Sequence, residues 1–284
     1  MLRIVTDGAA DMPENWGKEF EINILPLRVV FGNTTYTQGE NFTHSDFYRL
    51  VNETKIIPKS SLPSIGQIID FYKGIAQNGD TILSIHITSK LSGTFSTVVA
   101  AARELVNEFN IYAYDSGAGS AAQAFLCREA RIMDRAGYSI AAILQRLDRI
   151  RSKWSLAFTL NKLEYAYLSG RINFFQNAVV SLLNIKPLVI LKDGLLEMAG
   201  RTRTRHHSLE KVVQTIQDRV GNNPINLAIV HAADFESAAF LREMAAKALN
   251  IKEVIITNLA IPIAANLGPG TVGMIAYPVD EEKA

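Results

Sequence analysis

The fold is decided by residues 81–109, which read TILSIHITSKLSGTFSTVVAAARELVNEF. The segment opens with an apolar run at residues 81–87, as expected for a buried β-strand. A loop rich in glycine and hydroxyl side chains follows at residues 88–94. Apolar residues then recur at spacings of three and four, which predicts a helix with one face against the sheet. The members of this face are Phe95, Val98, Val99, Ala102, Leu105, Val106 and Phe109.

The same order of strand, polar loop and helix recurs in the first half of the chain. Apolar runs at residues 2–5 and 111–114 lead into TDG at residues 6–8 and DSG at residues 115–117. This alternation predicts a parallel sheet with helices on both faces. Because such sheets bind ligands beyond the carboxyl ends of their strands, we expect the three polar loops to share one edge.

The loop at residues 88–94 is a candidate anion site. Ser92, Gly93 and Thr94 stand where the predicted helix begins, and a helix N-terminus presents free amide groups and the positive end of its dipole. Glycine lets a ligand approach the backbone. This favours a carboxylate or a phosphate as the ligand. The alternative is that the hydroxyl groups only cap the helix, as Thr43 and Ser139 are expected to do at two further helix starts.

Three other clusters carry polar groups. Ser60, Ser61 and Ser64 precede a predicted helix over residues 65–77. Either these hydroxyl groups donate to an anion, or the cluster reflects only an ordinary N-cap at Ser64. Residues 266–271 (NLGPGT) form a Gly-Pro-Gly loop, which is either a backbone nest for an anion or a buried turn. Residues 201–207 (RTRTRHH) are the only basic cluster. If this cluster is extended, its arginines face one side, towards a phosphate, an acidic partner or solvent.

The second half of the chain is less regular. Residues 162–184 look helical with a break at 169–171 (SGR), and residues 192–194 (KDG) mark a hairpin. Residues 254–279 carry no charge, but their prolines and glycines argue against a membrane helix, so we expect two buried strands around the Gly-Pro-Gly loop. The remaining predicted elements are strands at 153–160, 187–191, 195–198 and 226–231 and helices at 209–220 and 237–249.

These elements predict an α/β protein of two domains. The first covers residues 1–152 and carries a mainly parallel sheet and the hydroxyl-rich ligand loops. The second covers residues 153–284 and carries the Gly-Pro-Gly loop and further apolar segments. No linker rich in proline, glycine or serine marks the boundary.

Composition excludes several classes of protein. Hydrophobic residues make up 48% of the 284 residues, which suffices for a core and excludes disorder over most of the chain. The net charge of +1 provides no field that would draw the chain to nucleic acid. The single cysteine, Cys127, excludes an intrachain disulfide and a multi-cysteine metal site, and we expect no metal. The opening MLRIVTD is no signal peptide, so we expect a soluble cytoplasmic protein.

Candidates for catalysis are few. Asp7 and Asp115 form an acid/base pair or are turn formers, since each directly follows a strand. His86 and His231 lie in or at the end of strands and are expected to be structural, and Cys127 is expected to pack in a helix. Phosphate-loop, nucleophile-elbow and His-Glu-x-x-His motifs are absent, and the glycines at residues 117–122 lack the acidic partner of a dinucleotide site.

Seven motifs taken together resemble the DegV family, which includes the fatty-acid-binding subunits of bacterial fatty acid kinase. In order they are TDGAAD (6–11), SSLPS (60–64), SKLSGT (89–94), YDSG (114–117), GRI (170–172), IKP (185–187) and GPG (268–270). The resemblance covers essentially the whole chain. It implies two α/β domains with a lipid pocket between them. It also implies a long-chain fatty acid as ligand, presented to a separate kinase subunit that makes acyl-phosphate for phospholipid synthesis.

The resemblance also assigns residues by position. The carboxylate would be bound by Ser60 and Ser92, with Gly93, Asn266 and Gly268 completing the site. Arg171 resembles an arginine linked to kinase docking, and Arg203 a second one, although Arg201 or Arg205 could be the match. No residue of this chain would be catalytic, no cofactor is implied, and transient contact with a membrane is compatible with a lipid ligand. Candidates for the pocket wall are Phe158, Leu160, Phe174, Phe175, Val179, Leu182, Leu183 and Ile190.

Two departures from the family pattern keep alternatives open. Asn266 stands where the family commonly has histidine, and asparagine cannot carry a positive charge. Gly8 replaces the usual serine of the first motif. The alternatives are an enzyme that acts on a small carboxylated or phosphorylated metabolite, and a regulatory module whose pocket is vestigial.

Overall fold

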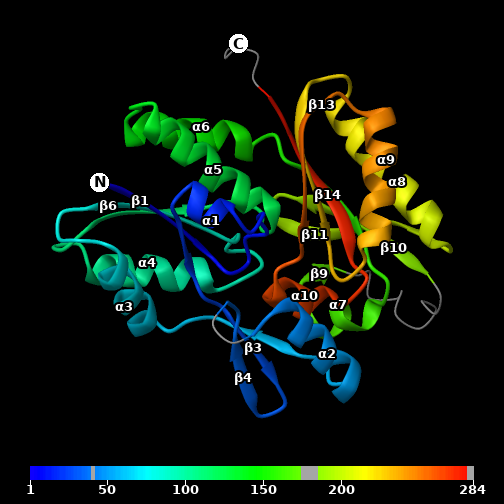
Figure 1. Cartoon of the computed structure of the whole chain (residues 1–284), viewed down its shortest axis with the longest axis horizontal. Helices are drawn as coiled ribbons and strands as arrows, with labels where there is room; N and C mark the ends of the chain where they lie inside the picture. The colour runs from blue at the N-terminus through cyan, green and yellow to red at the C-terminus, as the bar shows by residue number, and fades with distance from the viewer. Residues whose placement is uncertain (40–41, 174–184, 280–284) are drawn as a thin grey trace. The chain divides into compact units, whose positions relative to one another are not determined.

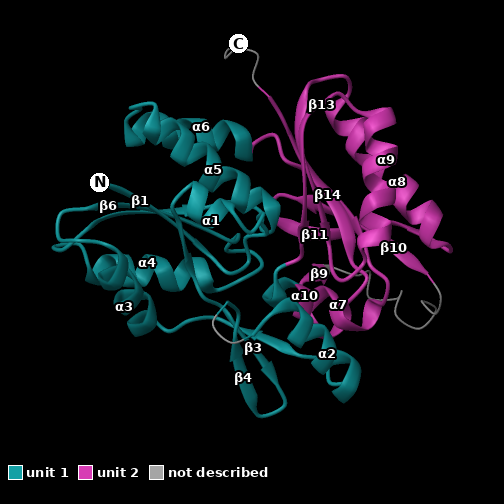
Figure 2. Ribbon diagram, in the orientation of Figure 1, with its two compact units in different colours: residues 1–151, 260–263 teal, residues 152–259, 264–284 magenta. Residues whose placement is uncertain are grey.

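The computed structural model describes residues 1–39, 42–173 and 185–279 (Figure 1). The chain divides into two compact units (Figure 2). The first comprises residues 1–151 and 260–263, and the second comprises residues 152–259 and 264–284. The short segment at residues 260–263 therefore belongs with the N-terminal unit, although it follows most of the second unit in the sequence.

The first unit is built on a four-stranded parallel sheet in the order β2-β1-β6-β7. Its strands are β1 (Leu2–Asp7), β2 (Ile22–Leu25), β6 (Thr81–His86) and β7 (Asn110–Asp115). The parallel sheet predicted from the alternation of strands and helices is confirmed. β2 was not predicted.

Helices cover both faces of this sheet. On one face, α3 (Ile65–Ile75) and α4 (Thr94–Glu104) enclose a core that includes Ile68, Tyr72 and Val98. On the other lie α5 (Ala121–Arg135), which contacts β1 and β6, and α6 (Ile140–Arg151), which packs on α5 (Figure 1). α4 ends at Glu104, and Val106 is 70% exposed. The prediction of Val106 on the apolar face is therefore wrong, because the chain has left the helix before that residue.

A second, three-stranded antiparallel sheet in the first unit was not predicted. It has the order β4-β3-β5, with β3 (Arg28–Phe31), β4 (Thr34–Thr37) and β5 (Lys59–Ser61). The helices α1 (Trp16–Glu19) and α2 (His44–Thr54) complete the unit. The rings of Phe31 on β3, Phe47 on α2 and Phe42, which precedes α2, pack together.

Three helix starts confirm the expected capping residues. Thr43 and Ser64 each form a complete capping box with the residue three positions on, at α2 and α3. Ser139 accepts a hydrogen bond from the Ala142 amide at the start of α6. These caps satisfy amide groups that the first turn of a helix leaves without intrahelical partners.

The second unit contains a seven-stranded mixed sheet in the order β13-β12-β14-β8-β10-β11-β9. One face is covered by α8 (Arg205–Val220) and α9 (Phe235–Ala248), whose apolar side chains pack on the strands. The predicted hairpin is confirmed, since Asp193 and Gly194 have positive φ angles between β10 and β11. The strands are β8 (Ser155–Thr159), β9 (Ile172–Asn173), β10 (Lys186–Lys192), β11 (Leu195–Thr202), β12 (Ile225–His231), β13 (Ile251–Asn258) and β14 (Val272–Pro278).

Two predictions for the second half need correction. Between β13 and β14 the chain forms a helix, α10 (Ile261–Leu267), where only a loop was expected. Pro262 is tolerated there because it lies in the first turn, where the amide needs no intrahelical partner. The predicted break at residues 169–171 is confirmed, because α7 (Leu163–Ser169) ends where Gly170 adopts a left-handed conformation. The correction concerns residues 172–173, which form β9 where a helix was expected. The predicted helical residues 174–184 lie outside the described residues.

Within the described ranges, none of the helices is both long enough and apolar enough to cross a membrane.

Candidate functional site

Three polar loops meet at one edge of the parallel sheet. The register pairs Thr6 with Ile85 and His86 with Asp115, so β1, β6 and β7 all end at this edge. The predicted juxtaposition is confirmed. In addition, the Thr88 amide after β6 donates to the Ala118 carbonyl after β7 over 2.7 Å, which ties two of the loops together.

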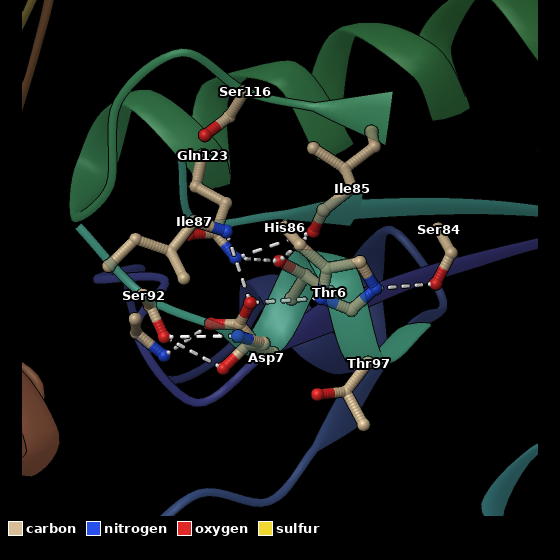
Figure 3. Close-up of polar contacts among 12 residues, drawn as sticks. Thr6, Asp7, Ser84, Ile85, His86, Ile87, Ser92, Thr97, Ser116 and Gln123 are labelled. Carbon is tan, nitrogen blue, oxygen red and sulfur yellow. Dashed lines mark hydrogen bonds and ion pairs between the residues drawn. The ribbon is translucent and has the colours of Figure 1, made fainter. Parts of the chain in front are cut away.

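Asp7 lies at this edge with three hydrogen-bonded contacts to its carboxylate, which is fully buried. One oxygen accepts from the Ala9 amide at 2.9 Å, while the other accepts from the Ile87 amide at 3.1 Å and lies 2.9 Å from His86 Nδ1 (Figure 3). Burial alone would raise the pKa of Asp7. The hydrogen bond and charge of His86, with the Ala9 amide, outweigh burial and lower that pKa below 3.8.

A chain of buried side chains continues from Asp7. His86 Nε2 lies 2.7 Å from Ser84 Oγ, and Ser84 Oγ lies 2.7 Å from the Tyr72 hydroxyl on α3. The order Asp-His-Ser matches that of a hydrolase triad. However, Ser84, His86 and Tyr72 are all fully buried, so no substrate reaches this serine. The expectation that His86 has a structural role agrees with this burial.

Asp115 is engaged by its own loop. Its carboxylate accepts from the Gly117 amide at 2.8 Å and from the Ser89 amide at 3.0 Å. Asp7 and Asp115 are therefore both held by backbone amides at the ends of their strands, which is the arrangement of turn formers. This geometry does not favour the acid/base pair that the enzyme alternative requires. Cys127 is likewise buried, and burial raises the pKa of its thiol to about 12.

The start of α4 has the features of an anion site. Ser92 Oγ accepts from the Thr94 amide at 3.3 Å and lies 2.9 Å from Thr94 Oγ1. Within the described part of the chain, the amides of Gly93, Phe95 and Ser96 have no hydrogen-bond partner. Gly93 is exposed and Ser92 half-buried. Unpaired amides and an accessible hydroxyl at a helix N-terminus suit a carboxylate or phosphate.

The second predicted serine approaches this site through its loop. Ser60 is half-buried on β5, where it pairs with Val29 of β3. Two residues on, the Leu62 side chain lies against Gly93: a Cβ built on Gly93 would be 3.5 Å from Leu62 Cδ2. Leu62 is nevertheless 49% exposed. The structure therefore brings the SSLPS loop to the start of α4 and sets an exposed apolar side chain beside its amides.

Asn266 and Gly268 lie in the second unit at the end of α10. Asn266 is half-buried, and Gly268 is buried with a φ of +84°. Thr271 Oγ1 donates to the Gly268 carbonyl at 2.8 Å, which fixes the Gly-Pro-Gly turn. The roles of Asn266 and Gly268 in carboxylate binding stay predictions.

Replacing Gly268 by alanine is expected to destabilise the second unit. The positive φ penalises any L-residue, and the new Cβ would lie 2.8 Å from the Tyr165 ring, so we expect a loss of about 2 kcal/mol in unfolding free energy. Urea unfolding measures it. Gly200→Ala is the matched control, because its Cβ would meet only ordinary contacts with Leu188. Equal unfolding midpoints for the two variants would contradict the account.

The basic cluster is not one extended face. β11 ends at Thr202, and Thr204 caps α8, so the chain turns between the arginines. Arg203 is exposed, whereas Arg205 points inward: its Nη2 donates to the Gly270 carbonyl at 2.7 Å and its Nε to Ser237 Oγ at 3.1 Å. The condition for three arginines on one side, an extended cluster, is therefore not met, and Arg205 holds the Gly-Pro-Gly loop.

The remaining candidates lie in the second unit. Arg171 is exposed, and its guanidinium donates to the Ser169 carbonyl. Of the proposed wall residues, Phe158 and Leu160 are buried, and Ile190 is partly buried and packs against the core under α8 and α9. Their roles in a pocket wall stay predictions. The wall candidates Phe174, Phe175, Val179, Leu182 and Leu183 lie outside the described residues.

Asp11 is a buried residue to which sequence reasoning gave no role. Its carboxylate accepts from the Ala260 amide at 2.6 Å and from the Ser120 hydroxyl. Burial raises the pKa of Asp11 to about 7, although both hydrogen bonds lower it. The sequence did contain a signal for this residue, because Asp11 is the last residue of the TDGAAD motif. Its partner Ala260 is 249 positions away and follows no recognisable spacing.

Comparison with known proteins gives independent information. The model of the DegV family matches residues 1–279. A DegV domain-containing protein of Listeria monocytogenes is 32% identical over 278 residues, which cover 96% of this chain and 97% of that protein. A fatty-acid-binding DegV family protein of Thermus thermophilus is 29% identical, with a TM-score of 0.87 over 98% of this chain and 99% of that one. A stearic acid-binding protein of Eubacterium ventriosum is 26% identical, with a TM-score of 0.87 over 98% of each chain.

Proposed function

This chain belongs to the DegV family, and we propose that it binds one long-chain fatty acid through its carboxylate at Ser92 and Gly93. The observation that carries the proposal is the start of α4. The amides of Gly93, Phe95 and Ser96 have no partner among the described residues, and the Ser92 hydroxyl stands beside them. A carboxylate accepts several such hydrogen bonds at once, and charge makes each of them stronger.

The surroundings of this anion site favour an amphiphile over a small polar metabolite. Leu62 lies against Gly93 and is 49% exposed, and Ile65 at the start of α3 is 37% exposed. Apolar side chains beside a carboxylate site match a ligand whose charged end continues into hydrocarbon. Each buried methylene of such a chain contributes about 0.8 kcal/mol, so length adds affinity quickly. Relatives named for fatty acid or stearic acid binding support the same ligand class.

Titration with a matched pair of ligands tests this proposal. Lipid-free protein is titrated with stearic acid and with stearyl alcohol, which have the same hydrocarbon chain. We expect the acid to bind at least about tenfold more tightly, since only the carboxylate makes charge-assisted hydrogen bonds. Equal affinities, or no binding of either ligand, would refute the proposed site.

The finer part of the proposal is that the bound carboxylate is presented to a separate kinase subunit, which forms the acyl-phosphate. This chain would contribute binding and no chemistry, consistent with the engagement of Asp7 and Asp115 by backbone amides. Arg171 and Arg203 are both exposed cations suited to an acidic surface on that partner. No cofactor is proposed.

Alanine at Arg171 or Arg203 is expected to lower acyl-phosphate formation by the partner kinase about tenfold, the usual size of a docking arginine's contribution. Stearic acid affinity should not change, because neither side chain is assigned to the carboxylate. Arg242→Ala is the control, since Arg242 is an exposed arginine of α9 outside the family motifs. Loss of lipid binding in the Arg171 or Arg203 variant, or full kinase coupling in both, would count against docking roles.

A further inference from the structure

The Asp7–His86 pair has a hydrogen-bond direction that its chemistry fixes. Both oxygens of Asp7 accept from backbone amides, which favours the charged form of the carboxyl and lowers its pKa, so His86 Nδ1 carries the proton that bridges to Asp7. When the imidazole is neutral, His86 Nε2 then accepts from Ser84, and Ser84 accepts from the Tyr72 hydroxyl. Each bond then has one donor and one acceptor along the whole chain, whose part from Asp7 through His86 to Ser84 is drawn in Figure 3. The imidazole is therefore locked in one tautomer and one orientation.

The Asp7–His86 pair contacts the backbone that leads to Ser92. The oxygen of Asp7 that faces His86 also accepts from the Ile87 amide. The next residue, Thr88, anchors the turn, because its carbonyl accepts from the Leu91 amide at 3.1 Å and from the Ser92 amide at 3.2 Å. Asp7 thus fixes the position from which the turn to Ser92 begins.

The same chain reaches the other serine loop. Tyr72 lies on α3, whose N-cap Ser64 ends the SSLPS segment that contains Ser60. The hydrogen bonds from Tyr72 to Asp7 therefore connect α3 with the loop before α4. Ser92 lies in that loop, and Ser60 lies on β5, in the segment that leads into α3. Since Asp7, Ser84, His86 and Tyr72 are all fully buried, none of them can touch a ligand from its present position.

We propose that Asp7 and His86 are positioning residues that set the start of α4 for carboxylate recognition. This inference rests on the proposed function. It predicts that the pair controls the preference for a carboxylate and not the affinity for the hydrocarbon chain. The readout is therefore the ratio of stearyl alcohol to stearic acid dissociation constants, which a general loss of stability does not move.

Two substitutions at His86 separate the bond to Asp7 from the rest of the side chain. His86→Asn places an amide nitrogen near the position of Nδ1 and retains a donor to Asp7. His86→Gln places its amide near the position of Nε2 and loses that donor. We expect the ratio of alcohol to acid dissociation constants to fall about tenfold in His86→Gln. In His86→Asn most of the wild-type ratio should be retained. Alcohol affinity should stay within about twofold of wild type in both variants.

The control variant removes a buried hydrogen-bond network at the other end of the strands of this sheet, where β1 and β2 begin. Arg131 is buried and donates to the carbonyls of Leu2 and Phe20, far along β1 from Asp7. Arg131→Gln should lower the unfolding midpoint in urea and leave the ratio unchanged. Asp7→Asn is a second test, because asparagine has an NH2 group in place of one carboxylate oxygen and so cannot accept from the Ala9 amide on one side and from His86 and Ile87 on the other. We expect the ratio of alcohol to acid dissociation constants to fall in Asp7→Asn as it does in His86→Gln.

The outcomes distinguish the inference from the proposed function. If wild-type protein shows no preference for the acid, the proposed function fails and this inference fails with it. If wild type prefers the acid and His86→Gln or Asp7→Asn keeps that preference, only the positioning role is overturned. A ratio that falls equally in Arg131→Gln would also overturn it, because the effect would then follow stability alone.

Discussion

Ser92→Ala is expected to weaken stearic acid binding by at least about tenfold and to leave stearyl alcohol binding unchanged, since a hydrogen bond to a charged group contributes about 1.5–3 kcal/mol. The Ser92 hydroxyl stands beside the unpaired amides at the start of α4 and is half-buried, so water replaces it poorly. Competition with a fluorescent fatty acid measures both constants.

The control for this prediction is a serine in the same helix. Ser96→Ala removes an exposed hydroxyl of the first turn while retaining its amide, which is the group assigned to the ligand. Stearic acid affinity should fall by less than about threefold in this variant, as for an exposed neutral group. Unchanged acid affinity in Ser92→Ala would remove Ser92 from the site.

Asp11→Asn is expected to change how stability depends on pH. In the folded chain the pKa of Asp11 is about 7, compared with 3.8 for the ordinary carboxyl. Between these values the folded chain retains a proton that the unfolded chain has lost, so stability is highest at low pH and falls as pH rises towards 7. Asparagine mimics the protonated acid and removes this fall. Relative to wild type, the free energy of unfolding of Asp11→Asn should therefore increase by about 1 kcal/mol per pH unit between pH 3.8 and about pH 7.

Urea unfolding at pH 5, 6, 7 and 8 measures this difference. Trp16 lies in the first unit, and its fluorescence can be isolated by Trp154→Phe. That replacement removes no hydrogen bond, because the Trp154 indole nitrogen has no partner within the described ranges. The two stability curves should diverge up to pH 7 and run parallel above it. Parallel curves over the whole range would show that Asp11 does not titrate as its burial implies.

The edge that carries the site could be predicted from the sequence because its signals are local. Each of the three strands is a continuous apolar run followed directly by a polar loop, and the parallel pairing then places the loops together. Ser92 and Gly93 could likewise be located at a helix start, since the apolar face of α4 begins immediately after them.

Other parts of the fold had no comparable signal. β5 is three residues long and reads KSS, and β4 reads TTYT, so neither strand shows the alternation that marks a half-buried strand. α10 reads IPIAANL, and a helix that is apolar on nearly every side has no period to detect.

Long-range polar pairs were also beyond local patterns. Asp7 and His86 are 79 positions apart, and neither residue type nor spacing indicates that they meet in the core. The inward turn of Arg205 depends on where β11 ends and α8 begins, a boundary of one or two residues that alternating arginines and threonines do not mark.

The most direct test of the central claim is the identity of what the protein carries. The chain is purified from a bacterial host and denatured, and the released small molecules are identified by mass spectrometry. The account predicts one fatty acid of long chain per protein molecule, and Ser92→Ala protein should release less of it. A protein that releases no fatty acid, and takes up none when stearic acid is added, would contradict the claim that this chain is a fatty acid carrier.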